Sequence, residues 1–205
     1  MKEEILQTAL EQFLKYGIRK ITIQKLVEPM GISTKTVYKS FKNKEELLED
    51  VLQLFYNQQY QIFKNIATVN SSVVILFDAW AKGLEMEYGV NKVFFQDLHN
   101  YYPELELKAE TSISTQYWEQ LQQIILRGID EGVFIPGIVP EIVLESMAVL
   151  FTTIVRSNQF KKFNRPPEEI LFNTLAPLVR GICTEKGINE LNSHISSTHF
   201  YQQSK

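Results

Sequence analysis

The 205-residue sequence has a single cysteine, Cys183, and lacks the long apolar runs of membrane proteins. One cysteine excludes an internal disulfide framework and fits a reducing compartment. No apolar stretch approaches the roughly eighteen to twenty residues that a membrane-spanning helix needs. The first residues, MKEEILQ, include acidic side chains and no signal-peptide core, so we expect a cytoplasmic protein.

Strand-like alternation of apolar and polar residues is also missing, and no segment repeats at a fixed period. The apolar fraction of 44% and the charged fraction of 22% are ordinary for a soluble globular protein. The length leaves room for one large or two small domains. Apolar residues recur at the three- and four-residue spacing of amphipathic helices, so we expect an all-α protein.

The most informative stretch covers residues 17–48, which reads as two short helices, a tight turn between them and the start of a third. Thr22 can cap the first helix, and Gly31 supplies the left-handed backbone that ends it. Ser33 can cap the second helix, whose outward face is polar and basic. A short helix pair with glycine in the turn is typical of a helix-turn-helix DNA-binding motif.

Helices are also predicted on both sides of this motif. The first runs from about Lys2 to Tyr16, where Gly17 stops it. The third helix of the motif begins at Lys44, behind a capping-box pattern of Asn43 and Glu46, and continues to about residue 67. It is therefore long enough to link the DNA-binding domain to the rest of the protein.

The charge pattern indicates what the motif meets. Between Lys15 and Lys44 the chain has eight basic residues and one acidic residue, Glu28, a net charge of +7. The whole chain carries −3, so the remainder carries −10. Positive charge concentrated in thirty residues of an acidic protein favours a polyanionic partner. A solvated lysine-rich face is the alternative, but the helix-turn-helix spacing favours DNA.

A set of apolar, turn and capping residues recurs at unbroken spacing through this region: Ile5, Ala9, Phe13, Gly17, Thr22, Leu26, Gly31-Ile32-Ser33, Val37-Tyr38, Phe41, Lys44-Glu45 and Leu47-Leu48. With this pattern the segment resembles the DNA-binding domain of the TetR family of transcriptional regulators. The resemblance implies a three-helix DNA-binding domain, which we place at residues 1–48. A larger helical ligand-binding and dimerisation domain then covers residues 49–205.

The expected contacts with DNA divide into two groups by their place on the helices. At the N-terminal end of the second motif helix, Thr34, Lys35 and Thr36 are expected to read bases, with phosphate as the alternative partner of Lys35. Tyr38, Lys39, Thr22 and Lys44 are expected to contact phosphate. For Tyr38 the alternative is packing over Phe41, and the family resemblance favours the phosphate contact.

The C-terminal half contains two strongly apolar helical segments. One begins at Pro140 and is apolar nearly all round, and the other begins near residues 164–169 and should kink at Pro177. Such helices suggest a homodimer interface built as a four-helix bundle, with a monomeric core as the alternative. We assign to this interface Met147, Leu150, Phe151, Ile154, Leu175, Leu178, Val179 and Ile182.

In TetR-like proteins a small molecule binds among the middle helices and changes the spacing of the two DNA-binding domains. The resemblance therefore implies an unknown small-molecule ligand, and the aromatic composition suggests a largely apolar one. Candidate lining residues are Trp80, Phe94, Phe95, His99, Tyr102 and Trp118. Plain core packing is the alternative for such an aromatic stripe. No cationic cluster lies among these residues, so a strongly anionic ligand is not indicated.

These observations favour a dimeric, ligand-responsive repressor of the TetR type that binds a palindromic double-stranded operator. No metal or cofactor is expected, because the three histidines lack metal-ligand spacing and no glycine-rich phosphate loop is present. An enzyme is thus the least favoured class. A helical scaffold or nucleic-acid-binding protein without a small-molecule ligand remains the alternative, and competition between specific and random DNA distinguishes it.

Overall fold

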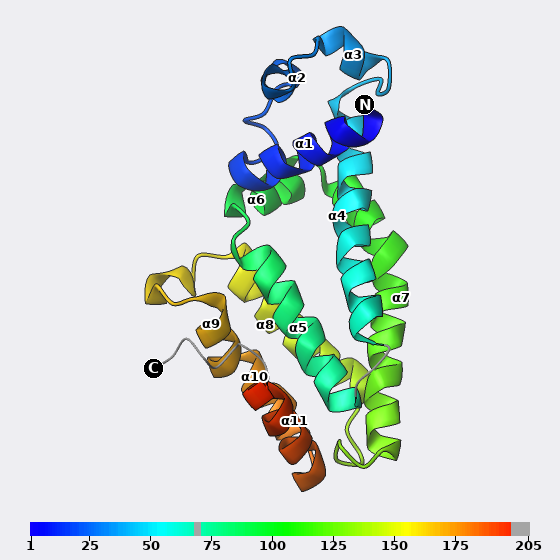
Figure 1. Ribbon diagram of the computed structural model, residues 1–205, viewed down its shortest axis with the longest axis vertical. Helices are drawn as coiled ribbons and strands as arrows, with labels where there is room; N and C mark the ends of the chain where they lie inside the picture. The colour runs from blue at the N-terminus through cyan, green and yellow to red at the C-terminus, as the bar shows by residue number, and fades with distance from the viewer. Residues whose placement is uncertain (68–70, 198–205) are drawn as a thin grey trace. The chain divides into compact units, whose positions relative to one another are not determined.

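The computed structural model describes residues 1–67 and 71–197, apart from the side chains of 110–114. The helices, drawn in Figure 1, are α1 (Lys2–Tyr16), α2 (Ile23–Val27), α3 (Thr34–Tyr38), α4 (Lys44–Ile66), α5 (Ser72–Tyr88), α6 (Lys92–Tyr101), α7 (Pro103–Asp130), α8 (Pro140–Arg156), α9 (Pro167–Asn173), α10 (Leu175–Gly181) and α11 (Glu185–Ser197). In these ranges the only extended pairing is an isolated bridge between Phe134 and Cys183. The predicted all-α class is confirmed.

The chain forms two compact units. The first consists of Met1–Gln61 and Val90–Thr115, and the second of Ile62–Gly89 and Gln116–Lys205. The boundary predicted at residue 48 follows the helix-turn-helix motif, whereas the first unit also includes most of α4, all of α6 and the first part of α7. Within the described ranges, no helix is both long enough and apolar enough to span a membrane.

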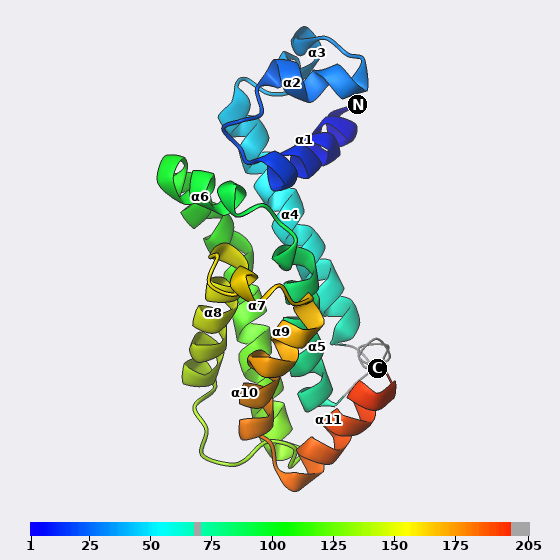
Figure 2. The same cartoon turned by 90° about the vertical axis from the view of Figure 1, so that its left-hand side faces the viewer.

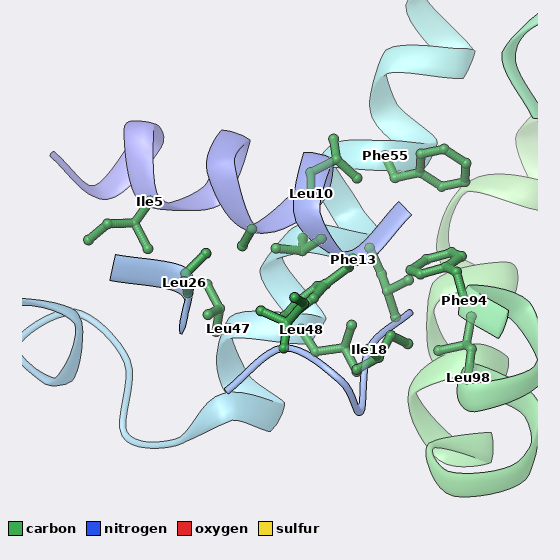
Figure 3. Packing of buried hydrophobic residues seen from close by; sticks show 14 of the residues in the cluster. Ile5, Leu10, Phe13, Ile18, Leu26, Leu47, Leu48, Phe55, Phe94 and Leu98 are labelled. Atoms are coloured by element: carbon green, nitrogen blue, oxygen red, sulfur yellow. The ribbon is translucent and has the colours of Figure 1, made fainter. Parts of the chain in front are cut away.

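The first unit has one hydrophobic core to which α1, α2, α4 and α6 all contribute (Figure 3). Phe13 and Leu26 are fully buried, as are Leu47 and Leu48 at the start of α4. Phe94 of α6 joins them and lies 6.1 Å from Phe55, ring centre to ring centre. Residues far apart in the sequence therefore complete the support of the helix-turn-helix.

The capping signals of the motif are present as predicted. The Lys25 amide donates to the Thr22 hydroxyl at 3.2 Å, and the Glu46 amide donates to Asn43 Oδ1 at 2.8 Å. The Glu46 carboxylate reaches back to the amide of Lys42, one residue before the cap, at 2.6 Å. Gly31 has φ +64°, the left-handed conformation expected of it.

In the second unit, α5 is the central helix, because α8, α9, α10 and α11 all pack against it (Figure 2). Almost every residue from Val73 to Ala81 is buried. The apolar helix predicted from Pro140 needs cover on both sides. Within the single chain, α8 leaves Ile142 65% and Val149 59% exposed, so one side has no cover from the described residues.

The last long helix predicted from the sequence is divided in two. A kink was expected at Pro177, but the backbone breaks at Thr174, which has φ −131° and ψ −80°. Pro177 has no amide hydrogen to donate, and its ring crowds the carbonyl four residues earlier, at Asn173. The break removes that conflict, and the Thr174 hydroxyl bonds the Ile170 carbonyl at 2.5 Å.

Candidate DNA interface and ligand site

The outward face of α3 has the side chains that the sequence assigned to DNA. Lys35 and Lys39 are exposed, and Tyr38 is 54% exposed, so its ring does not pack into the core beside Phe41. Val37 and Phe41 are buried and fix the helix against the unit. The buried side of α3 thus anchors the helix, and its opposite, cationic side presents Lys35, Tyr38 and Lys39 to a partner.

Threonines flank this face at the helix starts. Ser33 caps α3 by accepting from the Thr36 amide at 3.3 Å, and its hydroxyl lies 3.1 Å from the Thr36 hydroxyl. Thr34 is half-buried in the first turn of α3. Thr22 is exposed at the start of α2, where its oxygen already accepts from Lys25. The caps therefore hold the hydroxyls of Thr22, Ser33 and Thr36 in place.

Lys44 differs from the sequence-based expectation of a phosphate contact. Its ammonium group turns inward, donates to the Ile18 carbonyl at 2.6 Å and lies 5.5 Å from the centre of the Phe13 ring. Burial lowers the pKa of Lys44, and the nearby Asp97 carboxylate partly opposes that shift. The ammonium therefore holds the turn after α1 in place.

Helix α6 is fastened to the same turn. The backbone amide of Asn91 donates to the Leu14 carbonyl at 2.9 Å. The side-chain amide of Asn91 donates to the Lys15 carbonyl at 3.0 Å. The Arg19 amide donates to the Asp97 carboxylate at 2.8 Å. Asp97 is 7% exposed, and the Arg19 guanidinium lies over Tyr101 at 4.0 Å from the ring centre. No sequence pattern predicted that Asn91 and Asp97 would contact this turn.

Four of the six aromatic and histidine residues predicted to line a ligand pocket belong to the first unit. Phe94 and Phe95 are buried in its core, with ring centres 5.2 Å apart. The His99 side chain is 78% exposed and pairs with Glu106 at 3.1 Å. Tyr102 is half-buried against the core. Its pKa is raised mainly by burial and, to a smaller extent, by the Glu45 carboxylate. Three of these four therefore lie in or against the core of the first unit, and His99 lies at its surface.

Trp80 and Trp118 do come together, in the second unit, with ring centres 6.4 Å apart. Phe151 lies 5.5 Å from Trp80, and Phe63 lies 4.7 Å from Tyr117. We call these five residues the aromatic cluster. Phe63 and Tyr117 were not among the residues predicted to line the pocket, and Phe151 was predicted for the dimer interface.

Polar groups lie at the aromatic cluster. The Trp80 indole nitrogen is buried without a hydrogen-bond acceptor among the described residues. Burial strongly raises the pKa of Tyr117, and the Glu87 carboxylate adds to this shift. Glu87 is 6% exposed on α5, seven residues after Trp80. An indole N–H, a neutral phenol and a carboxylate can therefore orient a ligand at an aromatic surface.

The residues predicted for the dimer interface fall into two sets. Met147, Ile154, Leu175 and Val179 are buried within the single chain. Leu150, Phe151 and Ile182 are half-buried, and Leu178 is 38% exposed. The most exposed apolar residues of α8 are Ile142 and Val149, seven apart and therefore on one face.

Comparison with known proteins agrees with the motif and the fold. Residues 5–51 match the sequence model of a family described as bacterial regulatory proteins, tetR family. The HTH-type transcriptional repressor KstR2 of Mycolicibacterium smegmatis is 25% identical over 144 residues, which cover 67% of this chain and 69% of that protein. KstR2 of Mycobacterium tuberculosis is 21% identical over 149 residues, which cover 66% and 70%.

Solved structures share the architecture. The ketosteroid transcriptional regulator KstR2 of Mycobacterium tuberculosis matches with a TM-score of 0.63 at 20% identity, over 90% of this chain and 95% of that chain. The transcriptional regulator FadR from Bacillus subtilis, solved in complex with stearoyl-CoA, matches with a TM-score of 0.72 at 20% identity, over 89% and 100%. At these identities the likeness shows a common fold.

Proposed function

Because the chain belongs to the TetR family of bacterial regulatory proteins, we propose that it is a ligand-responsive, sequence-specific repressor of transcription, acting in the cytoplasm, and not an enzyme. The observation that carries this proposal is the exposed face of α3. Lys35, Tyr38 and Lys39 point outward from a helix whose other face is buried. A short, polar, cationic helix presented in this way suits the major groove of DNA.

The contacts with DNA are divided between bases and phosphates. Lys35 and Thr34, in the first turn of α3, reach base edges, and Lys35 can donate to guanine O6 and N7. Tyr38, Lys39 and the start of α2 at Thr22 contact phosphate. Thr36 supports α3 through its contact with Ser33 and joins Thr34 in base readout.

The ligand site lies in the second unit at the aromatic cluster. The ligand is largely apolar, because five aromatic rings meet there, and it presents a hydrogen-bond acceptor to the Trp80 indole. The stearoyl-CoA complex of the FadR relative supports testing acyl thioesters first. Ligand binding in this unit changes the affinity of the first unit for DNA.

The active form is a homodimer that reads a palindromic operator. The exposed face of α8, with Ile142 and Val149, supports an interface with α8 of a second copy, and Leu178 of α10 joins it. Val149→Asp should separate the subunits, and so should Ser146→Asp, because Ser146 is exposed between Ile142 and Val149 on the same face of α8. Sedimentation measures the oligomeric state of both variants, and two intact dimers would place the interface elsewhere.

Selection of bound duplexes from a random pool, at about physiological salt, tests the main proposal. Recovery of a palindrome is the expected result, and its half-sites are about one helical turn apart, roughly 34–36 Å, or a multiple of that spacing. Lys35→Ala should relax the preference at one position of the half-site. Failure to enrich any sequence, with and without candidate ligands, would favour a scaffold or a charge-driven nucleic-acid binder.

A further inference from the structure

A second cationic segment joins α8 to α9. Residues 156–165, which we call the cationic loop, contain four basic residues and no acidic one: Arg156, Lys161, Lys162 and Arg165. The guanidinium of Arg165 lies 3.5 Å from the Glu169 carboxylate, while Lys161 and Lys162 are exposed. Positive charge thus gathers on a chain whose net charge is −3.

The loop has a defined conformation. Lys161–Phe163 form a short 3-10 helix, and the amide of Asn164, in the left-handed conformation at φ 47°, donates to the Lys161 carbonyl. Phe163 is 54% exposed. Its ring centre lies 6.1 Å from that of Phe160 and 5.1 Å from the Lys162 ammonium. An aromatic face and two ammonium groups are therefore presented together to solvent.

Charge at a helix end does not account for this arrangement. Cations stabilise the C-terminal end of a helix only within its last turn. Arg156 lies in the last turn of α8, but Lys161 and Lys162 follow the C-cap Ser157 by four and five residues. The helix dipole also gives no reason for a phenylalanine ring in solvent beside them.

Helices α5 and α8 each connect the aromatic cluster to the cationic loop over a short distance. The Tyr88 hydroxyl, in the last residue of α5, donates to the Arg165 carbonyl at 3.3 Å. Trp80 precedes Tyr88 by eight residues and Phe151 precedes Arg156 by five. At 1.5 Å per residue these separations are about 12 Å and about 8 Å along the two helix axes.

We propose that the cationic loop binds the phosphorylated nucleotide end of a coenzyme A thioester whose acyl group occupies the aromatic cluster. The inference rests on the ligand site proposed above and adds the class of its ligand. Lys161, Lys162 and Arg165 bind the phosphates, and Phe163 offers its face to the adenine ring. The flexible arm of the coenzyme spans the distance between the loop and the cluster.

The test compares three probes on the full-length protein by titration calorimetry: stearoyl-CoA, free stearate and coenzyme A alone. Stearoyl-CoA should bind more than tenfold tighter than stearate, because several charge-assisted contacts are added and each is worth about tenfold. Its affinity should fall as salt is raised, whereas that of stearate should change little. Coenzyme A alone should bind weakly but measurably.

Two variants and a control assign the binding to the loop. Lys161→Ala/Lys162→Ala and Phe163→Ala should each weaken stearoyl-CoA and coenzyme A by about tenfold or more and leave stearate unchanged. Lys82→Ala removes an ammonium group of the same unit that pairs with Glu85 instead, and it should leave all three affinities unchanged. Because the loop residues are exposed, the variants should keep the thermal stability of the parent protein.

Equal affinity for stearoyl-CoA and stearate, no binding of coenzyme A, or unchanged binding by both loop variants would each overturn the inference. Duplex selection, run in parallel, separates this from failure of the proposed function. If a palindrome is selected but coenzyme A does not bind, the repressor proposal stands and the nucleotide site is refuted. If coenzyme A binding depends on the loop but no duplex is selected, the nucleotide site stands and the repressor proposal is refuted.

Discussion

The side-chain amide of Asn91 donates to the carbonyl of Lys15 while its oxygen accepts from the Val93 amide. One side chain thus satisfies a carbonyl at the end of α1 and an amide at the start of α6. The two residues are 76 positions apart in the sequence. The position of the turn that leads into the helix-turn-helix therefore depends on α6.

Asn91→Ser and Asn91→Ala separate the two roles of this side chain. Serine still caps α6 but is too short to reach Lys15, so we expect a loss of about 1 kcal/mol in the free energy of unfolding. Alanine loses both contacts and should cost about 2 kcal/mol. Chemical denaturation measures both values. Identical stability of the serine variant and the parent would show that the bond to Lys15 contributes nothing.

Gly17→Ala should be more harmful than Gly31→Ala. Both glycines have positive φ, but Gly31, with φ +64° and ψ 22°, is in the left-handed region, where alanine costs about 1–2 kcal/mol. Gly17, with φ +86° and ψ 159°, is in a region that only glycine ordinarily adopts, so alanine costs more there. A β-carbon at Gly17 would also lie 2.7 Å from Val93 Cγ1, whereas at Gly31 it meets nothing within 4 Å. Thermal unfolding should show the larger loss for Gly17→Ala, and adding Val93→Ala should restore part of it. No rescue would mean that the backbone alone sets the cost.

Lys39→Ala and Lys44→Met should affect DNA binding differently. Lys39 is exposed on α3, so its removal should weaken all sequences and lower the salt slope of binding by about one unit. The Lys44 ammonium bonds Ile18 instead, so Lys44→Met should lower stability and leave the slope unchanged. Duplex binding across a salt series measures both. A reduced salt slope for Lys44→Met would instead support the phosphate contact predicted for Lys44 from the sequence.

Replacing the indole of Trp80 with benzothiophene removes the buried N–H at nearly constant shape. The empty protein should become more stable, by about 1–3 kcal/mol, because a buried donor without an acceptor is removed. Binding of an acyl thioester should weaken in the same variant if its acceptor meets this donor. The same replacement at Trp118 serves as the control. Lower stability at position 80 would argue that the indole nitrogen has a partner.

Tyr117→Phe should flatten the loss of stability in alkali. The pKa of Tyr117 is raised above its ordinary value of 10.0 in the folded protein, so the unfolded chain releases this proton first. The unfolded state then binds fewer protons, and the free energy of unfolding falls as pH rises above about 10. Denaturation at pH 9 and pH 11 should show a smaller fall for Tyr117→Phe. An equal fall in stability for the parent protein and Tyr117→Phe would show that the phenol of Tyr117 is exposed to water.

The local elements of the first unit were predictable because their signals are local. Thr22, Gly31 and Ser33 each act on backbone groups within a few residues, and those bonds form as expected. The inward turn of Lys44 was not predictable, since the carbonyl that it bonds is 26 residues away. The sequence pattern of a lysine at the start of a helix is the same whether its ammonium contacts a DNA phosphate or a carbonyl of the protein.

Sequence periodicity could not assign the aromatic residues to one unit or the other. Phe94 and Trp80 look alike in sequence, but one packs in the first unit and the other in the second. Periodicity assigns a residue to a face and leaves open which element meets that face. The burial of Met147 and the exposure of Val149 on one apolar helix show the same limit.

The first unit is assembled from two separate stretches of chain, and this affects its folding during synthesis. After residue 61 has been made, 54 more residues must be added before residue 115 completes the unit. At about 5–20 residues per second this takes about 3–11 s. For the first 30 of these residues α1 lacks the contact from Asn91, and for the first 33 Phe55 lacks Phe94. Nascent chains halted near residue 100 should therefore engage ribosome-associated chaperones more strongly than chains halted near residue 150.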